Sequence, residues 1–344
     1  ISSKFATEKV PRHRMKKILI ALSLILMIMA VTDGSAKTKK SMEKRSAVKT
    51  VQKLSVDGNQ LVGEDGSPVV LHGISYGWHQ IWPRFWNKES CGYFVKEWNA
   101  QVVRASMGVS RPINEEMHNS YLQDPALGLR CLFEVVDAAI ANDVYVIIDW
   151  HSHDIFEEDA VKFFTQMAIK YKGVPNVIYE IFNEPDYESW EEVKIYSKAV
   201  IKAIRDIEPD AVILVGCPHW DQDIDKVAED PIQGERNLMY TMHFYAATHG
   251  KYLRDRTDAA MSKGIPVFVS ECAGMECTGD GPIDEKAWNE YLQWMQDRKL
   301  SWCAWSVSDK VETCSMLIPG AKATGYWTEE ELKPWAKIVR NALK

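Results

Sequence analysis

The sequence predicts a single-domain (β/α)8 barrel, an α/β fold in which eight parallel strands alternate with helices. Eight apolar runs of strand length follow one another from Val69 to Val307, helical patterns separate most of them, and each repeat takes about 34 residues. A doubly wound open sheet is the competing fold, but it usually has a glycine-rich turn after its first strand. Residues 72–76 (HGISY) contain no such turn. The barrel is therefore favoured.

The expected strands are rich in β-branched and aromatic residues and are bounded by turn residues or charges. They span residues 69–75, 101–107, 144–150, 177–182, 211–216, 238–245, 266–270 and 302–307. Apolar residues three and four positions apart predict helices at 129–142, 161–172, 190–207, 259–264 with an upstream turn, 285–299 and 329–343. A short hairpin at 54–62, around Asp57-Gly58-Asn59, precedes the barrel, and we expect it to close one end.

The N-terminal residues differ in composition from the rest of the chain. Residues 1–14 precede Met15 and are interpreted as upstream or added sequence, whereas residues 15–36 combine basic residues, an apolar run and small residues. This order is typical of a secretory signal peptide, with a retained membrane anchor as the alternative. Residues 37–53 are rich in Lys and Ser and predict a flexible linker, so the folded catalytic domain is expected at 54–344.

Composition narrows the possible partners. Of the 344 residues, 46% are hydrophobic and 26% are charged, as in soluble globular proteins. Residues 1–36 contain six basic and two acidic residues, so their removal would change the formal charge from −7 to −11. An acidic secreted protein is not expected to bind nucleic acid or to stay associated with a membrane, and we expect a monomer.

The seven cysteines and thirteen tryptophans point to different roles. An odd number of cysteines leaves at least one without an intramolecular partner; Cys272 and Cys277 could pair or remain free. The cysteine spacing contains no Cys-x-x-Cys motif, and we predict neither a metal site nor a cofactor. Thirteen tryptophans exceed what packing requires, and some are expected at the mouth of a cleft, where an indole offers a flat apolar face.

Two of the predicted strands end in a carboxylate. The run 177–182 stops at Asn183-Glu184-Pro185, and the run 266–270 stops at Glu271. Desolvating a carboxylate costs on the order of several kcal/mol, so a glutamate at such a position usually has a function. Capping of the next helix by Asn183 and Glu184 is the alternative. In a barrel the carboxyl ends of all strands meet at one face, and the sequence therefore predicts two carboxylates facing one cavity.

Other polar and aromatic residues are expected at the same face. Individually, each could be explained by a structural ion pair, a hydrogen-bonded core histidine or simple packing. Together they would surround the two carboxylates with a ring of hydrogen-bonding and stacking groups, formed by Arg104, His151, Trp220, His243, Tyr245 and Trp305.

Two carboxyl groups without a metal-ligand cluster or a Ser-His-Asp set suit glycoside hydrolysis. Glu271 is the expected nucleophile because Arg104 and Tyr245 could stabilise its ionised form. Glu184 is the expected acid and base, and the negative charge of Glu271 should raise its pKa. A double displacement requires the two carboxyl groups to lie roughly 5–5.5 Å apart.

The remaining ring residues have expected roles around this pair. Asn183 is placed to bond the 2-hydroxyl of the sugar, an interaction that strengthens as positive charge develops on the sugar. His243 is expected to hold Glu184 or its water in place. Trp220 and Trp305 are expected to stack on sugar rings.

Four segments together resemble the bacterial endoglucanases of glycoside hydrolase family five. They are 178–185 (IYEIFNEP), 147–151 (IIDWH), 243–245 (HFY) and 302–310 (WCAWSVSDK), and the resemblance extends over residues 54–344. It implies a retaining (β/α)8 enzyme that cuts internal β-1,4 bonds of cellulose-like glucans. One departure is Cys272-Ala273-Gly274, where many relatives have an aromatic residue and Gly after the nucleophile.

The resemblance also assigns roles to individual residues. It implies Glu184 as the acid and base, Glu271 as the nucleophile, and as supporting residues Arg104, His151, Asn183, His243, Tyr245 and Trp305. Lys310 and Glu312 resemble positions that hydrogen-bond sugar, and we assign His79 and Trp82 to more distant sugar contacts. The expected partner is a β-glucan polysaccharide or oligosaccharide. A mannanase or xylanase of the same fold, or a carbohydrate-binding barrel without activity, remains an alternative.

Overall fold

A computed structural model of the chain describes residues 51–110 and 118–344. Within them, eight parallel strands close a barrel in the order β10-β3-β4-β5-β6-β7-β8-β9, which confirms the predicted fold class. The barrel strands are β3 (His72–Tyr76), β4 (Val102–Gly108), β5 (Tyr145–His151), β6 (Val177–Glu180), β7 (Ile213–Val215), β8 (Leu238–Tyr245), β9 (Val267–Ala273) and β10 (Trp302–Val307). Each overlaps one of the predicted strands.

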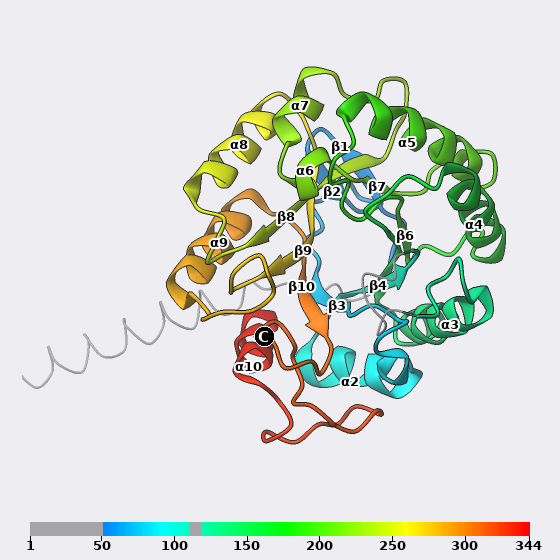
Figure 1. The fold of residues 1–344 in the computed structure, drawn as a ribbon. Helices are drawn as coiled ribbons and strands as arrows, with labels where there is room; N and C mark the ends of the chain where they lie inside the picture. Colours follow the sequence, from blue (N-terminus) through cyan, green and yellow to red (C-terminus); the bar gives the residue numbers. More distant parts are fainter. Residues whose placement is uncertain (1–50, 111–117) are drawn as a thin grey trace, which may run out of the picture. The chain divides into compact units, whose positions relative to one another are not determined.

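Helices surround the barrel and cover its outer face (Figure 1). They are η1 (Pro83–Phe85), α2 (Lys88–Trp98), α3 (Pro125–Ala141), α4 (Glu157–Lys170), α5 (Trp190–Arg205), α6 (Pro218–Asp221), α7 (Ile224–Glu229), α8 (Lys251–Ser262), α9 (Glu285–Arg298) and α10 (Pro334–Leu343). Capping residues fix several of the helix starts. The clearest is a capping box before α5, in which Ser189 and Glu192 each accept a hydrogen bond from the other's backbone amide.

The helix predictions differ from the structure at several places: η1, α6 and α7 are not predicted, and α3 and α4 begin four residues before the predicted positions 129 and 161. The sequence predicts no helix at α2, where Gly92 interrupts the apolar pattern, but Asn87 caps its start and Asn99 ends it in a left-handed conformation. Helix α8 begins at Lys251, well before the predicted 259, because its first two turns carry many charges. Helix α10 begins at Pro334 rather than Glu329, since proline is favoured at the first helical position.

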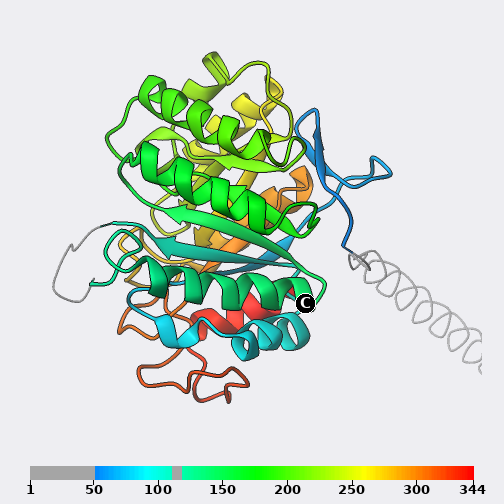
Figure 2. The ribbon, with the colours of Figure 1, turned by 90° about the vertical axis from the view of Figure 1, so that its right-hand side faces the viewer.

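A two-stranded hairpin lies at the N-terminal end of the barrel. Strands β1 (Ser55–Asp57) and β2 (Gln60–Val62) pair in antiparallel fashion. The Val56 amide donates to Asn237 just before β8, and Gln60 donates to the carbonyl of Arg298 at the end of α9. Figure 2 shows the hairpin on the side away from the strand arrowheads. The predicted closing role is consistent with this position.

The described end of the predicted linker contacts the barrel. The Gln52 amide donates to the hydroxyl of Tyr145 at 3.1 Å, and that hydroxyl donates to the Gln52 carbonyl at 2.9 Å. Lys53 forms an ion pair with Asp210 at 2.8 Å. These contacts attach residues 52 and 53 to the barrel. The upstream segment 1–14, the signal peptide 15–36 and residues 37–50 of the linker lie outside the described residues.

All seven cysteines lie among the described residues, and none forms a disulfide. Six are buried and Cys277 is exposed, so the alternative of free thiols at Cys272 and Cys277 holds. The Cys272 thiol donates to the carbonyl of Cys303 at 3.3 Å, and this contact packs the strand behind Glu271. Among the described helices, none has both the length and the apolar composition of a membrane span.

Candidate active site

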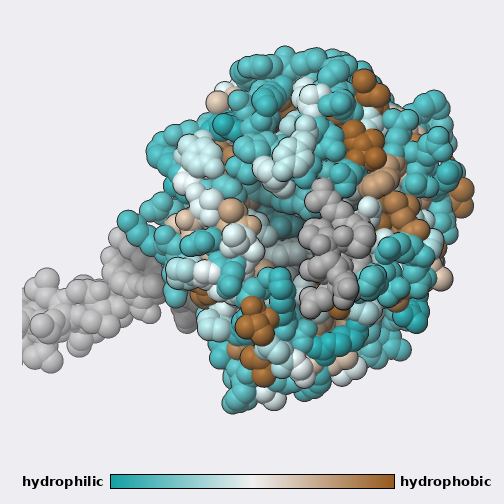
Figure 3. Space-filling view, in the orientation of Figure 1, coloured by the Kyte–Doolittle hydropathy of each residue, from teal (hydrophilic) through white to brown (hydrophobic). Residues whose placement is uncertain are grey.

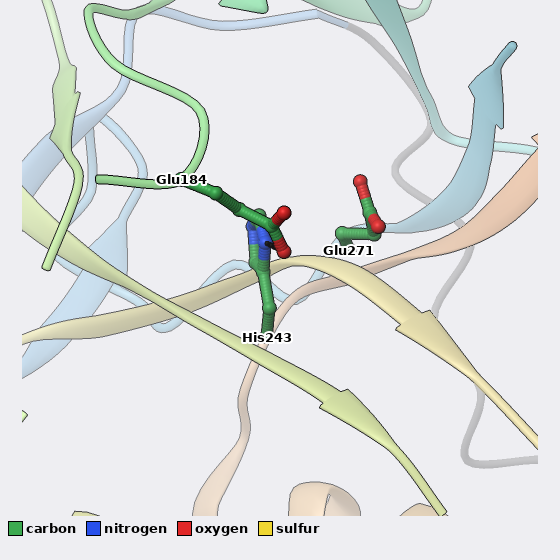
Figure 4. Close-up of side chains that lie close together, drawn as sticks. All are labelled: Glu184, His243 and Glu271. Carbon is green, nitrogen blue, oxygen red and sulfur yellow. Dashed lines mark hydrogen bonds and ion pairs between the residues drawn. The ribbon is translucent and has the colours of Figure 1, made fainter. Parts of the chain in front are cut away.

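The carboxyl end of the barrel brings the two predicted carboxylates together. Glu184 lies in the loop after β6, where its amide donates to the Ser152 carbonyl at 3.2 Å, and Glu271 lies on β9. His243 on β8 is in register with Glu271. One ligand atom from each of these three side chains lies within 4.8 Å of the other two. Figure 4 shows the His243 ring against the Glu184 carboxylate, with Glu271 across from it, and Figure 3 shows a largely hydrophilic hollow on this face.

Glu271 is held by two donors. The Arg104 guanidinium donates to its Oε2 at 2.9 Å, and the Tyr245 hydroxyl donates to its Oε1 at 2.8 Å. Both contacts were expected from the sequence. A cation and a hydroxyl donor are thus directed at the two oxygens of this carboxyl group, whose side chain is 5% exposed.

Arg104 is fully buried and links Glu271 to two further carboxylates. Its Nε and Nη2 donate to Glu180 at 2.8 and 3.0 Å, and Nη2 lies 3.0 Å from Asp149. Burial and the neighbouring Glu271 charge raise the pKa of Asp149 to about 7, against the opposing effect of Arg104. A single guanidinium thus faces more carboxyl groups than it can neutralise.

The carboxyl group of Glu184, the predicted acid, has a raised pKa, but the main cause differs from the predicted one. Burial is the largest cause, and the charges of Glu180 and Asp186 act in the same direction. His153 and Arg104 oppose the shift. The sequence attributes the shift to the charge of Glu271, and this attribution is corrected: removal of the carboxyl group from water dominates.

His243 connects Glu184 to the barrel interior. Its Nδ1 lies 2.9 Å from Oε1 of Glu184, as the sequence predicts, and its Nε2 lies 2.8 Å from the Ser270 hydroxyl. That hydroxyl donates to Glu180 at 2.7 Å. Burial lowers the pKa of His243 to about 4, so the imidazole is neutral at neutral pH and orients Glu184 without adding a positive charge.

Asn183 and His151 complete the interior side of the site. The Asn183 carbonyl oxygen accepts from Arg104 at 2.6 Å, while its buried Nδ2 has no hydrogen-bond partner among the described residues. His151 bonds Asp149 through Nδ1 at 2.7 Å, and its ring stacks on Trp305 with centroids 5.3 Å apart and planes 3° apart. His151 therefore fixes the orientation of Trp305, which is itself 8% exposed.

The predicted sugar-binding residues at the rim have different surroundings. Trp220 on α6 is partly buried and packs edge to face with the exposed Tyr187, with ring centroids 5.9 Å apart. Lys310 and Glu312 form an ion pair at 2.6 Å just after β10. These groups remain accessible, because Lys310 and Glu312 expose 57% and 14% of their side chains.

His79 and Trp82, the predicted residues for more distant sugar contacts, lie in the loop after β3. His79 is fully buried, and its Nδ1 accepts from the Gly108 amide at 3.1 Å. Trp82 is 8% exposed and packs tightly over Gly77, where a Cβ would lie 2.6 Å from the indole ring. Both side chains pack within the loop after β3, and their sugar contacts stay predictions.

Several residues of the site are not among those predicted from the sequence. Glu180 and Asp149 could have been recognised, because a charge inside an apolar strand is the same signal that identified Glu184. The loop residues gave no comparable signal. The additional residues are Trp78, Asp149, His153, Glu180, Tyr187, Asp221 and Ser270.

Two groups of described side chains bring three potential metal-ligand atoms together. One is Glu184, His243 and Glu271, and the other is the partly exposed set Asp154, Asp186 and Glu188. In the first group, Arg104 already occupies one oxygen of Glu271, and a guanidinium beside a carboxylate disfavours a metal cation. The absence of a metal or cofactor remains a prediction.

Comparison with known proteins assigns the chain to a family. Residues 62–311 match the model of the cellulase family, glycosyl hydrolase family 5. The chain belongs to this family. It is 40% identical over 280 residues to Endoglucanase Z of Dickeya dadantii, covering 79% of this chain and 64% of that protein. It is 38% identical to Endoglucanase A of Evansella cellulosilytica, covering 81% and 57%. The chain thus spans about three-fifths of the length of these relatives.

Solved structures show the same fold. A structure from Cytophaga hutchinsonii has a TM-score of 0.81 at 38% identity, covering 85% of this chain and 94% of that one. The catalytic domain of Thermobifida fusca endoglucanase Cel5A has a TM-score of 0.78 at 32% identity, covering 85% and 97%. A variant of that domain was solved in complex with cellotetraose.

Proposed function

We propose that this family 5 chain is a secreted, retaining endo-β-1,4-glucanase. The observation that carries the proposal is the pair Glu184 and Glu271: one carboxylate oxygen of each lies within 4.8 Å of the other, Arg104 and Tyr245 donate to Glu271, and His243 contacts Glu184. Retaining glycosidases hold their carboxyl groups roughly 5–5.5 Å apart, whereas inverting enzymes leave roughly 6.5–9.5 Å for a water molecule. The short separation supports double displacement.

In the first step, the ionised Glu271 attacks the anomeric carbon while Glu184 protonates the leaving glycosidic oxygen. The Glu271–carbon bond forms as the carbon–oxygen bond breaks. In the second step, the ionised Glu184 accepts a proton from water, and the resulting hydroxide displaces Glu271. Arg104 and Tyr245 supply the charge stabilisation that the departing carboxylate needs.

Asn183 supports the assignment of the sugar site. Its buried Nδ2 has no partner within residues 51–110 and 118–344, and an unpaired buried donor is costly unless a ligand satisfies it. A sugar 2-hydroxyl held beside the anomeric carbon would accept this hydrogen bond. The cellotetraose complex of the Thermobifida fusca variant and the names of the relatives favour a β-glucan as the polymer.

A substrate panel tests the polymer specificity. We expect the full chain to release reducing ends from carboxymethylcellulose much faster than from mannan or xylan, and NMR of the first product should show the β-anomer. Activity confined to mannan or xylan would replace the substrate assignment with one of the alternatives. A fully folded protein that binds cello-oligosaccharides without cleaving any polymer would instead indicate a binding barrel.

Trp220 and Tyr187 are expected to bind the leaving portion of the chain. The Trp220 amide donates to the Pro185 carbonyl at 2.9 Å, which attaches this aromatic pair to the loop that carries the acid Glu184. Loss of one stacking ring typically costs about 1 kcal/mol. We expect Trp220→Ala to lower kcat/KM for cellopentaose about 5-fold to 10-fold.

An aryl cellobioside places only its aryl group beyond the cleaved bond, so its kcat/KM should fall much less in Trp220→Ala. Tyr187→Ala should show the same selectivity for the longer substrate. Tyr326→Ala, which removes a half-exposed tyrosine that packs on Tyr93, serves as the matched control. Equal losses on both substrates would contradict a leaving-group subsite at this position.

A further inference from the structure

The turn after β7 has an unusual backbone conformation. His219, Trp220 and Asp221 have φ angles of 58°, 54° and 58°, in the left-handed region that L-residues avoid. This conformation costs roughly 1–2 kcal/mol per residue. The Asp221 amide donates to the Cys217 carbonyl at 3.1 Å, and the Trp220 amide binds Pro185. The surrounding structure thus enforces a strained turn, and strain of this kind is often associated with functional sites.

The turn buries the carboxyl group of Asp221 beside the proposed acid. The Asp221 side chain is fully buried, and its Oδ1 accepts from the Cys217 amide. Its Oδ2 has no well-aligned hydrogen bond within the described residues and lies 3.2 Å from Nδ1 of His243. The same nitrogen lies 2.9 Å from Glu184. Two carboxyl groups therefore converge on one ring nitrogen that can form a good hydrogen bond with only one of them.

Charged and titratable groups from all sides surround this junction. They are Arg104 on β4, His153 after β5, Glu180 on β6, Asp186 after β6, Cys217 after β7, His249 after β8 and Glu271 on β9.

Negative charge prevails in these surroundings. Arg104 is already shared among Asp149, Glu180 and Glu271. Burial raises the pKa of Asp221 well above its ordinary value, and the charge of Glu184 raises it further. The imidazole of His243, with a pKa of about 4, adds no positive charge at neutral pH. The two carboxyl groups at the junction therefore resist simultaneous ionisation, and their titrations are coupled.

We propose that Asp221 is a positioning residue for Glu184. The two carboxyl groups share protons at the Nδ1 side of His243. As a result, Asp221 extends to higher pH the range in which Glu184 can donate a proton. After one proton has left the pair, the remaining negative charge opposes the loss of the second. A fraction of the molecules consequently keeps Glu184 protonated at a pH where an isolated carboxyl group would be fully ionised. This inference rests on the proposed role of Glu184 as the acid.

Asp221→Asn tests the proposal, because the carboxamide keeps the size of the side chain and its oxygen can still accept from the Cys217 amide, but it cannot ionise. The measurement is the pH dependence of kcat/KM on carboxymethylcellulose. We expect the alkaline limb of the pH profile to shift to lower pH by roughly half to one unit. Asp221→Ser provides a second, smaller non-ionisable side chain and should move the limb in the same direction.

Asp223→Asn is the matched control. Asp223 lies two residues further along, where it pairs with Lys226 and Arg256 rather than with His243. This variant should keep the wild-type alkaline limb. Cleavage of 2,4-dinitrophenyl cellobioside, whose leaving group needs little protonation, should show no comparable shift in Asp221→Asn.

An alkaline limb that is unchanged or displaced upward in both Asp221 variants would overturn the proposal, whatever their absolute activity. If Glu184→Gln has the same alkaline limb as the wild type, the limb does not report the titration of Glu184. That result would overturn the proposed role of Glu184 itself. The two failures are therefore distinguishable.

Discussion

Glu271→Gln is expected to lower kcat on carboxymethylcellulose by roughly four orders of magnitude or more, the usual scale for loss of a nucleophile. The carboxamide has nearly the size of the carboxylate but cannot attack the anomeric carbon. The variant should still unfold cooperatively and bind cellotetraose in calorimetry. Glu276→Gln, at an exposed position after β9, is the matched control and should retain wild-type turnover. Comparable turnover in Glu271→Gln would reject the assignment.

Added azide distinguishes the two carboxyl groups by stereochemistry. With 2,4-dinitrophenyl cellobioside, Glu271→Ala should yield the α-glycosyl azide, because azide attacks from the face that Glu271 occupied. Glu184→Ala should yield the β-glycosyl azide, because azide replaces water in the second step. NMR of the products reads both outcomes, and an exchanged pattern would exchange the two roles.

Arg104→Met is expected to destabilise the fold and to impair catalysis together. The fully buried guanidinium pairs with Asp149, Glu180 and Glu271 at 2.8 to 3.0 Å. Removing one partner of a buried ion pair leaves uncompensated charge and costs about 3–5 kcal/mol. Urea unfolding at pH 7 should show this loss of unfolding free energy, and kcat should fall because Glu271 loses its cation.

Arg104→Lys separates charge from geometry. Lysine restores the cation but not the planar fork that holds Glu180 and Glu271 at once, so we expect partial recovery of stability and little recovery of kcat. Arg340→Met, at a surface pair with Glu329, should change stability far less. If the unfolding free energy of Arg104→Met were within about 1 kcal/mol of the wild-type value, Arg104 would not be needed to balance the charges of the buried carboxyl groups.

The barrel could be predicted from the sequence because its signals are local. Each buried parallel strand is an apolar run, and Glu271 interrupts one at its end, which marks the carboxyl face of the barrel. The neighbours Arg104 and Tyr245 could be assigned to Glu271 for the same reason, since both occupy strands that end at this face.

The remaining parts of the site depend on features that are not local. The burial of His79 depends on how the loop after β3 folds back. The aromatic composition of that loop is compatible with a cleft as well as with a packed loop. The cause of the raised pKa of Glu184 depends on burial, which spacing does not reveal. Asp221 escaped prediction because only the left-handed turn directs its side chain inward, and no glycine marks that turn in the sequence.

The hairpin β1–β2 lies on the side of the barrel away from the strand arrowheads (Figure 2), whereas Glu184 and Glu271 lie at the carboxyl end of the strands. A surface anchor introduced at the tip of this hairpin, for example through Asp57, would hold the protein with the carboxyl end of the barrel directed away from the support. Insoluble polymer could then reach the cavity without hindrance from the attachment. The geometry of the barrel thus offers a natural orientation for immobilising the protein.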